Sequence, residues 1–169
     1  MFLIDYATLN DIPAMMNIIE ESLPLIQDPD WFVGDTEKFY AKHIDETGFT
    51  LKATSVTDAS FAAYFTVRYP KLDPDNCGYD LNFTETDLLQ TAHMETCVVH
   101  PNHRGHHLEA RLMEEAIRIL KETEYRHLLG TVHPNNTASL KAFLSNEFHV
   151  AKTLKKYGGK LRHIMYRAL

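Results

Sequence analysis

The alternation of apolar and polar residues along the chain predicts the order of its secondary-structure elements. Residues 2–6 alternate as a short strand, and the apolar residues of segment 12–23 recur at the three- and four-residue spacing of a helix. Further strands are expected at residues 49–54, 61–67, 94–99, 128–132, 148–154 and 161–166. Further helices are expected from Asp30 or Asp35 to Ile44, and at residues 108–120 and 137–145.

This order of elements places the chain in the mixed α/β class. Hairpins surround β-α-β units, which predicts a central, mostly antiparallel twisted sheet of about seven strands, with a parallel pair near its middle and about four flanking helices. Residues 70–90 are polar and contain several prolines and acids. We therefore expect an exposed insertion there, with a short helix around residues 87–90.

Length and composition favour one folding unit. The chain has 169 residues, of which 44% are hydrophobic and 24% charged, and this suffices for one core of ordinary size. No internal repeat, low-complexity tract or linker rich in glycine and serine divides it. A single domain spanning residues 1–169 is expected.

The net charge limits the classes of partner. Lysine and arginine total 17 against 23 aspartates and glutamates, which gives a net charge of -6. An acidic chain argues against nucleic acid and against an anionic membrane as partners. An anionic ligand would have to be held by a local group of donors.

The cysteines and the N-terminal segment indicate the compartment. Cys77 and Cys97 form neither a CxxC pair nor a disulfide framework, and a disulfide is not indicated. Residues 1–16 contain no apolar run long enough for a signal sequence or a membrane span. We expect a cytoplasmic protein.

The segment that runs from the strand at 94–99 into the helix at 108–120 has the character of an anion site. Arg104 can bind two phosphate oxygens, Gly105 permits a close backbone approach, and the N–H groups of His106–Glu109 lie at the positive end of the helix dipole. A pyrophosphate would suit this arrangement. A surface loop with a solvated arginine is the alternative, because an isolated Arg-Gly pair does not separate the two.

The order of elements and four segments together resemble the GNAT superfamily of acyl-CoA-dependent N-acyltransferases over essentially the full chain. The four segments are ATLNDIPAMMNII, METCVVHPNHRG, HPNNTASLKAFLSNEF and KKYGGKLRHIMYRAL. The second is the most specific, because in that family this loop carries Arg or Gln, two residues, Gly, one residue, and Gly or Ala, and its backbone amides bind the pyrophosphate of coenzyme A. The resemblance implies a GNAT fold, acetyl-CoA as co-substrate, and transfer to an amine.

Two residues depart from the motif that this resemblance supplies. Arg104 fits the first position, but His107 and Glu109, on either side of Leu108, stand where the family has small residues. His107 adds a side chain at the closest backbone approach, and Glu109 adds a negative charge near the ligand. We expect weakened or redirected coenzyme binding that strengthens at lower pH, where the histidines of the loop become charged.

The resemblance also implies contacts further along the chain. Asn136 has the spacing of an asparagine that contacts the pantetheine or phosphate arm, although capping of the helix at 137–145 explains it equally well. Ser139 belongs to the same segment. Phe143 stands where many relatives have a tyrosine that protonates the departing thiolate, which leaves Tyr157 as a distant candidate for the acid.

Glu95 is the candidate general base that the resemblance implies. Family members place a carboxylate in the central strand, where it takes a proton from the attacking ammonium. A solvent-facing carboxylate, or one paired with an arginine, is the alternative. The backbone amides of Cys97, Val98 and Val99 would hold the pantetheine and polarise the thioester carbonyl, and the Cys97 side chain is expected to fill space on the strand.

We therefore expect direct transfer of an acetyl group from acetyl-CoA to a small-molecule or peptide amine within a ternary complex. A catalytically weak or inactive module that binds or senses coenzyme A is the alternative, because His107, Glu109 and Phe143 all depart from the family's common residues. The histidines around residues 93–107 match no zinc motif, and no metal is expected.

Two further questions stay open at the level of sequence. The aromatic residues Trp31, Phe32, Phe39 and Tyr40 either line an acceptor pocket or belong to the core. The C-terminal strand either closes the sheet of a monomer or pairs across a homodimer.

Overall fold

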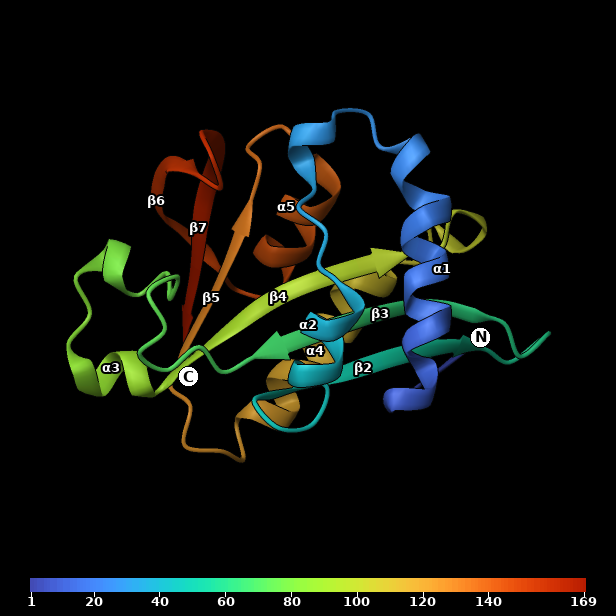
Figure 1. Cartoon of the computed structure of the whole chain (residues 1–169), viewed down its shortest axis with the longest axis horizontal. Helices are drawn as coiled ribbons and strands as arrows, with labels where there is room; N and C mark the ends of the chain where they lie inside the picture. The colour runs from blue at the N-terminus through green and yellow to red at the C-terminus, as the bar shows by residue number, and fades with distance from the viewer.

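A computed structural model describes residues 1–169, which form one seven-stranded sheet in the order β1-β2-β3-β4-β5-β7-β6 (Figure 1). The strands are β1 (Phe2–Tyr6), β2 (Gly48–Ser55), β3 (Phe61–Arg68), β4 (Thr91–Val99), β5 (His127–Val132), β6 (His149–Lys156) and β7 (Lys160–Ala168). Every neighbouring pair is antiparallel except β4 and β5, which are parallel. The predicted fold class, with its parallel pair in mid-sheet, is confirmed.

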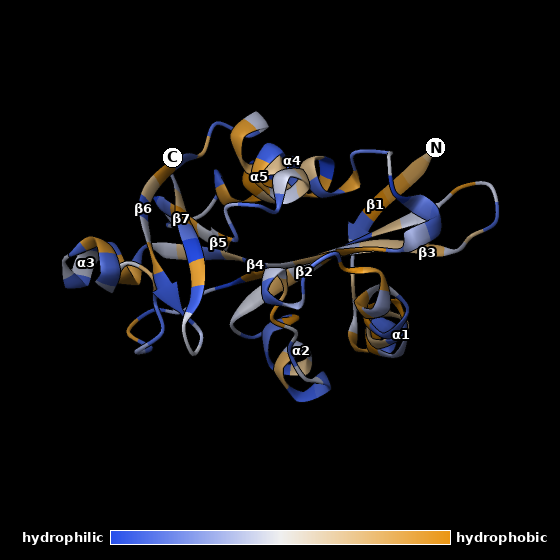
Figure 2. Ribbon diagram, turned by 90° about the horizontal axis from the view of Figure 1, so that it is seen from above, coloured by the Kyte–Doolittle hydropathy of each residue, from blue (hydrophilic) through white to orange (hydrophobic).

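Five helices accompany the sheet. They are α1 (Ile12–Ser22), α2 (Glu37–His43), α3 (Glu85–Leu89), α4 (Leu108–Leu120) and α5 (Thr137–Ser145). In the view from above, α1 and α2 lie on one face of the sheet and α4 and α5 on the other (Figure 2). The fifth helix is α3, the short helix of the polar segment. None of the helices combines the length and apolarity needed to cross a bilayer.

Each face of the sheet has its own apolar cluster. The larger one includes the buried stripe of α4, whose members are Leu108, Leu112, Met113, Ala116, Ile117 and Leu120. The smaller one joins α1 and α2 to the opposite face through Met15, Ile19 and Tyr40. Helical spacing of apolar residues therefore directs α1 and α4 onto opposite sides of one sheet.

A β-bulge in β4 exchanges the two faces of that strand. Thr66 of β3 pairs with Thr96, whereas the next residue, Val67, pairs with Met94, so Glu95 is the extra residue. Met94 consequently packs in the cluster of α4, while Val98 packs in the cluster of α1 and α2. In an unbroken strand these two residues would share a face.

The strands β4 and β5 part soon after they begin. Their pairing covers only Thr91–His93 of β4 and His127–Leu129 of β5. Beyond these residues the edge of β4 that faces β5 has no strand partner. This parting opens the middle of the sheet between the N-termini of α4 and α5.

The expectation that residues 70–90 form an exposed insertion is wrong for part of the segment. Asn76 and Cys77 are 1% and 2% exposed. The backbone N–H of Cys77 donates to His93 Nε2 at 3.1 Å, and Arg68 pairs with carboxylates of the insertion. Polar contacts therefore hold the segment against the end of β3 and the start of β4. Both cysteines of the chain are free thiols.

Candidate active-site cleft

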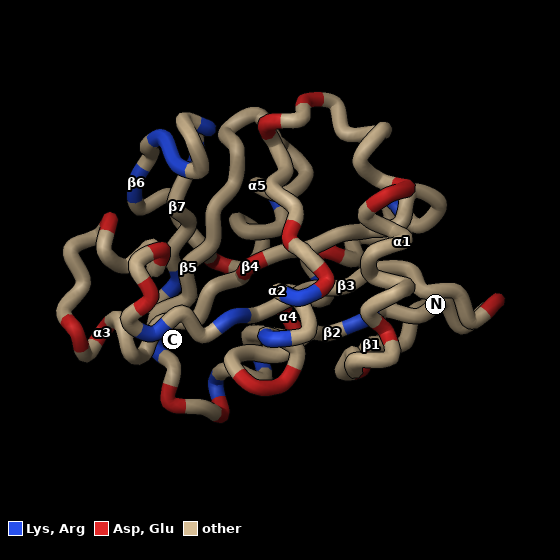
Figure 3. Tube along the Cα trace, in the orientation of Figure 1, with Lys and Arg blue, Asp and Glu red and all other residues tan.

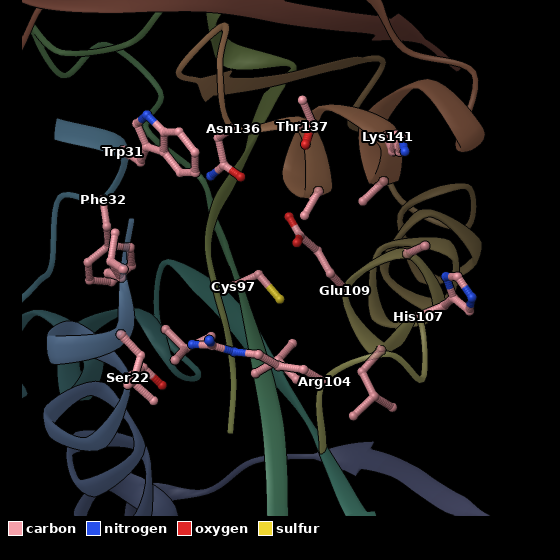
Figure 4. Close-up of a pocket in the computed structure, with 18 of the residues that line it drawn as sticks. Ser22, Trp31, Phe32, Cys97, Arg104, His107, Glu109, Asn136, Thr137 and Lys141 are labelled. Atoms are coloured by element: carbon pink, nitrogen blue, oxygen red, sulfur yellow. The ribbon is translucent and has the colours of Figure 1, made fainter. Parts of the chain in front are cut away.

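A cleft of about 810 Å³ lies where β4 and β5 part, between the end of α1 and the N-termini of α4 and α5 (Figure 4). A volume of this size lies within the range of small-molecule sites, about 300–1,000 Å³. Nine of the twelve predicted coenzyme contacts line it: Cys97, Val98, Val99, Arg104, Gly105, His107, Leu108, Glu109 and Asn136. One cavity therefore brings together the predicted strand edge, the predicted anion loop and the predicted asparagine.

The head of α4 presents free backbone donors to this cleft. The first hydrogen bond of the helix runs from the N–H of Arg111 to the carbonyl of His107, which leaves the N–H groups of the first turn without partners in the helix. The loop reaches this point through two left-handed residues, Gly105 with φ +83° and His107 with φ +56°. Unpaired donors and the helix dipole make this end of α4 attractive to an anion.

The charges of the cleft gather at this end. Its charged or histidine side chains are His103, Arg104, His107, Glu109 and Lys141, all from α4, α5 or the loop before α4. Glu109 is the one acid among them. Ser139 Oγ donates to Glu109 Oε1 at 2.7 Å, and burial raises the pKa of this carboxyl despite that hydrogen bond. No arginine or lysine forms an ion pair with Glu109.

The opposite side of the cleft carries no charge. It consists of Ile19, Ser22, Leu23, Leu25, Ile26, Gln27, Trp31 and Phe32, which we call the uncharged wall. The sequence left undecided whether Trp31 and Phe32 line a pocket or belong to the core. Both line the cleft, whereas Tyr40 is fully buried in the core. The other residues of the wall were not identified from the sequence, since their apolar spacing is that of any core-facing helix end.

Three predicted coenzyme contacts lie outside the cleft lining. His106 is exposed, with its ring centroid 5.1 Å from that of Phe2. Ser139 acts on the cleft only through its hydrogen bond to Glu109. Phe143 is 4% exposed and packs in the core, where a Cβ atom on Gly130 would come within 2.5 Å of its ring.

Glu95 lies in the bulge of β4, on the same face of the sheet as α1 and α2. Its Oε2 is buried and accepts no hydrogen bond, although His93 Nδ1 lies 3.4 Å away and Arg68 Nη1 3.7 Å away. Burial acts to raise the pKa of Glu95, but the neighbouring His93 and Arg68 outweigh it, so the pKa is lowered. Glu95 does not itself line the cleft, but it holds an ionised oxygen with no hydrogen bond two residues before Cys97, which does.

A second carboxylate near Glu95 was not identified from the sequence as a functional residue. Asp35, in the segment before α2, accepts a hydrogen bond from Thr96 Oγ1 at 3.2 Å. Burial, together with the charge of Glu95, raises the pKa of Asp35 to about 6. The sequence showed Asp35 only as a possible helix start, because its nearness to Glu95 arises from the tertiary fold.

Tyr157 lies at the turn between β6 and β7 and does not line the cleft. Its hydroxyl hydrogen-bonds with Thr131 Oγ1 at 3.1 Å, and burial raises its pKa. The thiol of Cys97 is likewise held protonated, because burial and the nearby Glu109 raise its pKa. No three side chains of His, Cys, Asp or Glu lie close enough together to hold a metal ion.

The chain resembles known proteins both in sequence and in structure. A model of the acetyltransferase (GNAT) family matches residues 61–148. None of the curated protein sequences compared with the chain matches it.

Solved structures resemble the fold along nearly its whole length. A ribosomal-protein-alanine N-acetyltransferase from Brucella melitensis is 22% identical, with a TM-score of 0.72 and coverage of 99% of both chains. An N-acetyltransferase from Staphylococcus aureus is 19% identical, with a TM-score of 0.70 and coverage of 98% of this chain and 96% of the other. A protein from Salmonella typhimurium, described as an acetyltransferase with its cofactor acetyl-CoA, is 19% identical, with a TM-score of 0.70 and coverage of 99% and 94%.

Proposed function

The chain belongs to the acetyltransferase (GNAT) family, and from this premise we propose that it transfers an acetyl group from acetyl-CoA to a primary amine, directly and within a ternary complex. The observation that carries the proposal is the continuity of the cleft. It joins the free donors at the head of α4 to the unpaired edge of β4 at Cys97–Val99. One ligand with an anionic end and an extended amide-bearing arm matches both parts.

The residues of the cleft fit most of such a ligand. Arg104 and the first-turn N–H groups of α4 suit the pyrophosphate, because guanidinium and amide donors form charge-assisted hydrogen bonds with phosphate oxygens. The free edge of β4 suits the amides of the pantetheine arm, which can add to it as a strand does. Asn136 supports this arrangement from the opposite side, where it also accepts from Ser139 N and caps α5.

Glu109 is the exception to this fit. Its carboxylate stands in the first turn of α4, where an incoming phosphate group would meet a like charge without a counter-ion between them. A proton on Glu109 removes the repulsion, and burial favours that proton. Coenzyme binding is thereby coupled to the protonation of this residue.

The reaction assigns Glu95 to the removal of a proton. An alkylammonium with a pKa of about 10.4 must lose a proton before its nitrogen can attack a thioester. The Oε2 of Glu95, which accepts no hydrogen bond in the structure, accepts that proton, directly or through a water molecule. The amine nitrogen adds to the thioester carbonyl and forms the C–N bond, and backbone N–H groups near Val98 stabilise the resulting oxyanion. The oxyanion then collapses, the C–S bond breaks and the thiolate of coenzyme A leaves.

The thiolate leaves without a dedicated acid. Phe143 has no proton to donate, and Tyr157 lies outside the cleft lining. A thiol has a reference pKa of about 8.5, so its thiolate is a tolerable leaving group that water can protonate.

A second candidate function rests on Glu109, His107 and Phe143, which all differ from the family's common residues. These three changes together would suit a module that binds coenzyme A and senses it without turnover. The two functions differ in one observable, the release of free coenzyme A.

The experiment incubates the purified protein with acetyl-CoA and a mixture of primary amines, and measures free thiol over time. Acetyl transfer predicts amine-dependent release that falls strongly in Glu95→Gln. Tight binding of coenzyme A with no release in any amine favours the sensing module. Release that proceeds equally without amine contradicts both.

A further inference from the structure

The cleft has two chemically different ends. Its charged and histidine side chains all come from α4, α5 or the loop before α4, whereas the uncharged wall contains no ionisable side chain. In Figure 4, Cys97 lies between Trp31, Phe32 and Ser22 on one side and Glu109, His107 and Lys141 on the other. The side chain of Arg104 extends towards Ser22. A ligand that spans the cleft therefore passes from an anion-binding environment into a neutral one.

Resting on the acetyl transfer proposed above, we propose that the uncharged wall selects the acceptor, and that this acceptor is a primary amine on an aryl or branched alkyl body with one neutral hydrogen-bond acceptor, such as an amide carbonyl. A second ammonium group placed against the wall would lose hydration without gaining a counter-ion, because no acid lines the wall. An apolar body gains about 25 cal/mol for each Å² that it removes from water there.

The wall has apolar surface to offer. Leu23 and Leu25 are 49% and 57% exposed, and both line the cleft. Trp31 and Phe32 are partly buried and extend the same surface inwards. Exposed leucines next to a pair of aromatic rings form a contact surface for a hydrocarbon group.

Ser22 points to the hydrogen-bonding group of the acceptor. The residue is 6% exposed, and its Oγ is buried with no hydrogen-bond partner, although the side chain lines the cleft. Buried hydroxyl groups almost always have a partner, because an unmade hydrogen bond costs about 1–3 kcal/mol. When the Ser22 side chain turns towards the cleft, a carbonyl oxygen on the acceptor would accept from this hydroxyl.

The wall is held in place rather than free to adapt. Lys160 Nζ of β7 pairs with Asp30 Oδ1 at 2.8 Å, and Arg162 Nη2 donates to the carbonyl of Asp30 at 2.6 Å. The next residue, Trp31, stacks with His133, their ring centroids 6.2 Å apart. Because these contacts fix the wall before any ligand arrives, its shape can discriminate between acceptors.

Trp31 allows the binding of the acceptor to be measured without any reaction. It is the one tryptophan of the chain, and it belongs to the wall. In the presence of coenzyme A, the full-length protein is titrated with phenylalaninamide, phenethylamine or spermidine while tryptophan fluorescence is recorded. We expect half-saturation by phenylalaninamide at a concentration at least about tenfold below that of spermidine, with phenethylamine in between. Tighter binding of spermidine overturns the proposal.

Two substitutions locate the effect on the wall. Leu25→Glu places a charge there and is expected to weaken phenylalaninamide binding about tenfold. Leu9→Glu is the matched control, because Leu9 is 54% exposed outside the cleft. Ser22→Ala is expected to weaken phenylalaninamide binding about fivefold and to leave phenethylamine unchanged, since only the amide bears a carbonyl. Equal losses for both amines, or for both leucine variants, contradict the assignment.

The donor's acyl chain is the other group that the wall could hold. If octanoyl-CoA changes Trp31 fluorescence and displaces phenylalaninamide while acetyl-CoA does not, the wall binds the acyl chain and the proposal fails. A peptide with an N-terminal phenylalanine, compared with phenylalaninamide, distinguishes a peptide acceptor from a small one. Binding of apolar amines without release of coenzyme A would support this inference and contradict the acetyl transfer. Acetylation of spermidine but not of phenylalaninamide would support the acetyl transfer and contradict this inference.

Discussion

The carboxylate of Glu109 accepts a hydrogen bond from Ser139 at 2.7 Å inside the cleft where the head of α4 presents its free N–H groups. The pair joins the first turns of α4 and α5. It places an acid in a site whose other ionisable groups, apart from the Cys97 thiol, are cations or histidines. We therefore expect the protonation of this one side chain to decide how well the site binds an anion.

Glu109→Gln should bind acetyl-CoA about tenfold more tightly than the wild type at pH 8, because the amide keeps the shape and removes the charge. Burial raises the pKa of Glu109, so the wild type binds best below that pKa and loses affinity as the pH rises through it. The variant should lack the part of the pH dependence that is due to Glu109. Calorimetric titration between about pH 5 and pH 8 measures this.

Glu114→Gln is the matched control for this experiment, since Glu114 lies on the exposed side of the same helix. Its affinity for acetyl-CoA should equal that of the wild type at every pH. Parallel pH profiles for Glu109→Gln and the wild type would show that Glu109 does not oppose the ligand.

His107→Gly should raise both stability and coenzyme affinity. His107 has a φ of +56°, which a residue with a Cβ adopts at a cost that glycine avoids, so the free energy of unfolding should rise by about 0.5–1 kcal/mol. The substitution also removes the imidazole from the point where the backbone comes closest to the ligand, so acetyl-CoA should bind more tightly. Urea unfolding and calorimetry measure the two effects.

Lys71→Gly separates these effects, because Lys71 has a φ of +49° but does not line the cleft. It should gain stability without any gain in coenzyme affinity. If His107→Gly gains stability but binds acetyl-CoA as the wild type does, the side chain of His107 does not obstruct the site.

Glu95→Gln should lower kcat about 100-fold while the KM for acetyl-CoA stays unchanged, because the loss of a general base affects the chemical step alone. The pKa of Glu95 lies below its usual range, so the wild-type carboxylate should stay ionised throughout the neutral range. Steady-state kinetics with one fixed amine provide the measurement. Glu85→Gln, on α3, is the control. A kcat within about twofold of the wild type would remove Glu95 from the mechanism.

The sequence predicted those parts of the site that depend on local pattern. The stripe of α4 and the Arg-Gly pair before it lie within 17 residues of each other, and the helix N-terminus follows directly from them. The sequence left undecided whether Asn136 caps a helix or contacts a ligand. The structure shows that it caps α5 and lines the cleft.

The bulge at Glu95 could not be predicted from alternation. Met94 and Val98 lie four residues apart and read as one face of a strand, yet they pack on opposite sides of the sheet. The burial of Asn76 and Cys77 was equally hidden, because it depends on a contact with His93, 16 residues away. Figure 3 shows the acidic residues of that segment, in red, scattered along its backbone. By pattern alone, such scattered acids indicate a segment exposed to solvent.

The uncharged wall was hidden for a related reason. Leu25 and Ser22 line the cleft through the tertiary fold, in which α1 packs on the sheet and β7 contacts the following segment at Asp30. Such a contact joins residues 130 positions apart in the chain. Local propensity contains no information about it.

Calorimetric titration of the wild type and of Arg104→Ala with acetyl-CoA shows whether the head of α4 and the free edge of β4 form an acetyl-CoA site. We expect a saturable isotherm for the wild type and an affinity about 10- to 100-fold weaker for Arg104→Ala, because a charge-assisted contact to phosphate is lost. Arg118→Ala, which removes an exposed arginine of α4 that pairs with Glu115, should bind as the wild type does. No heat of binding in the wild type at millimolar acetyl-CoA, where the affinity would be about 4 kcal/mol or less, would mean that this cleft is not an acetyl-CoA site.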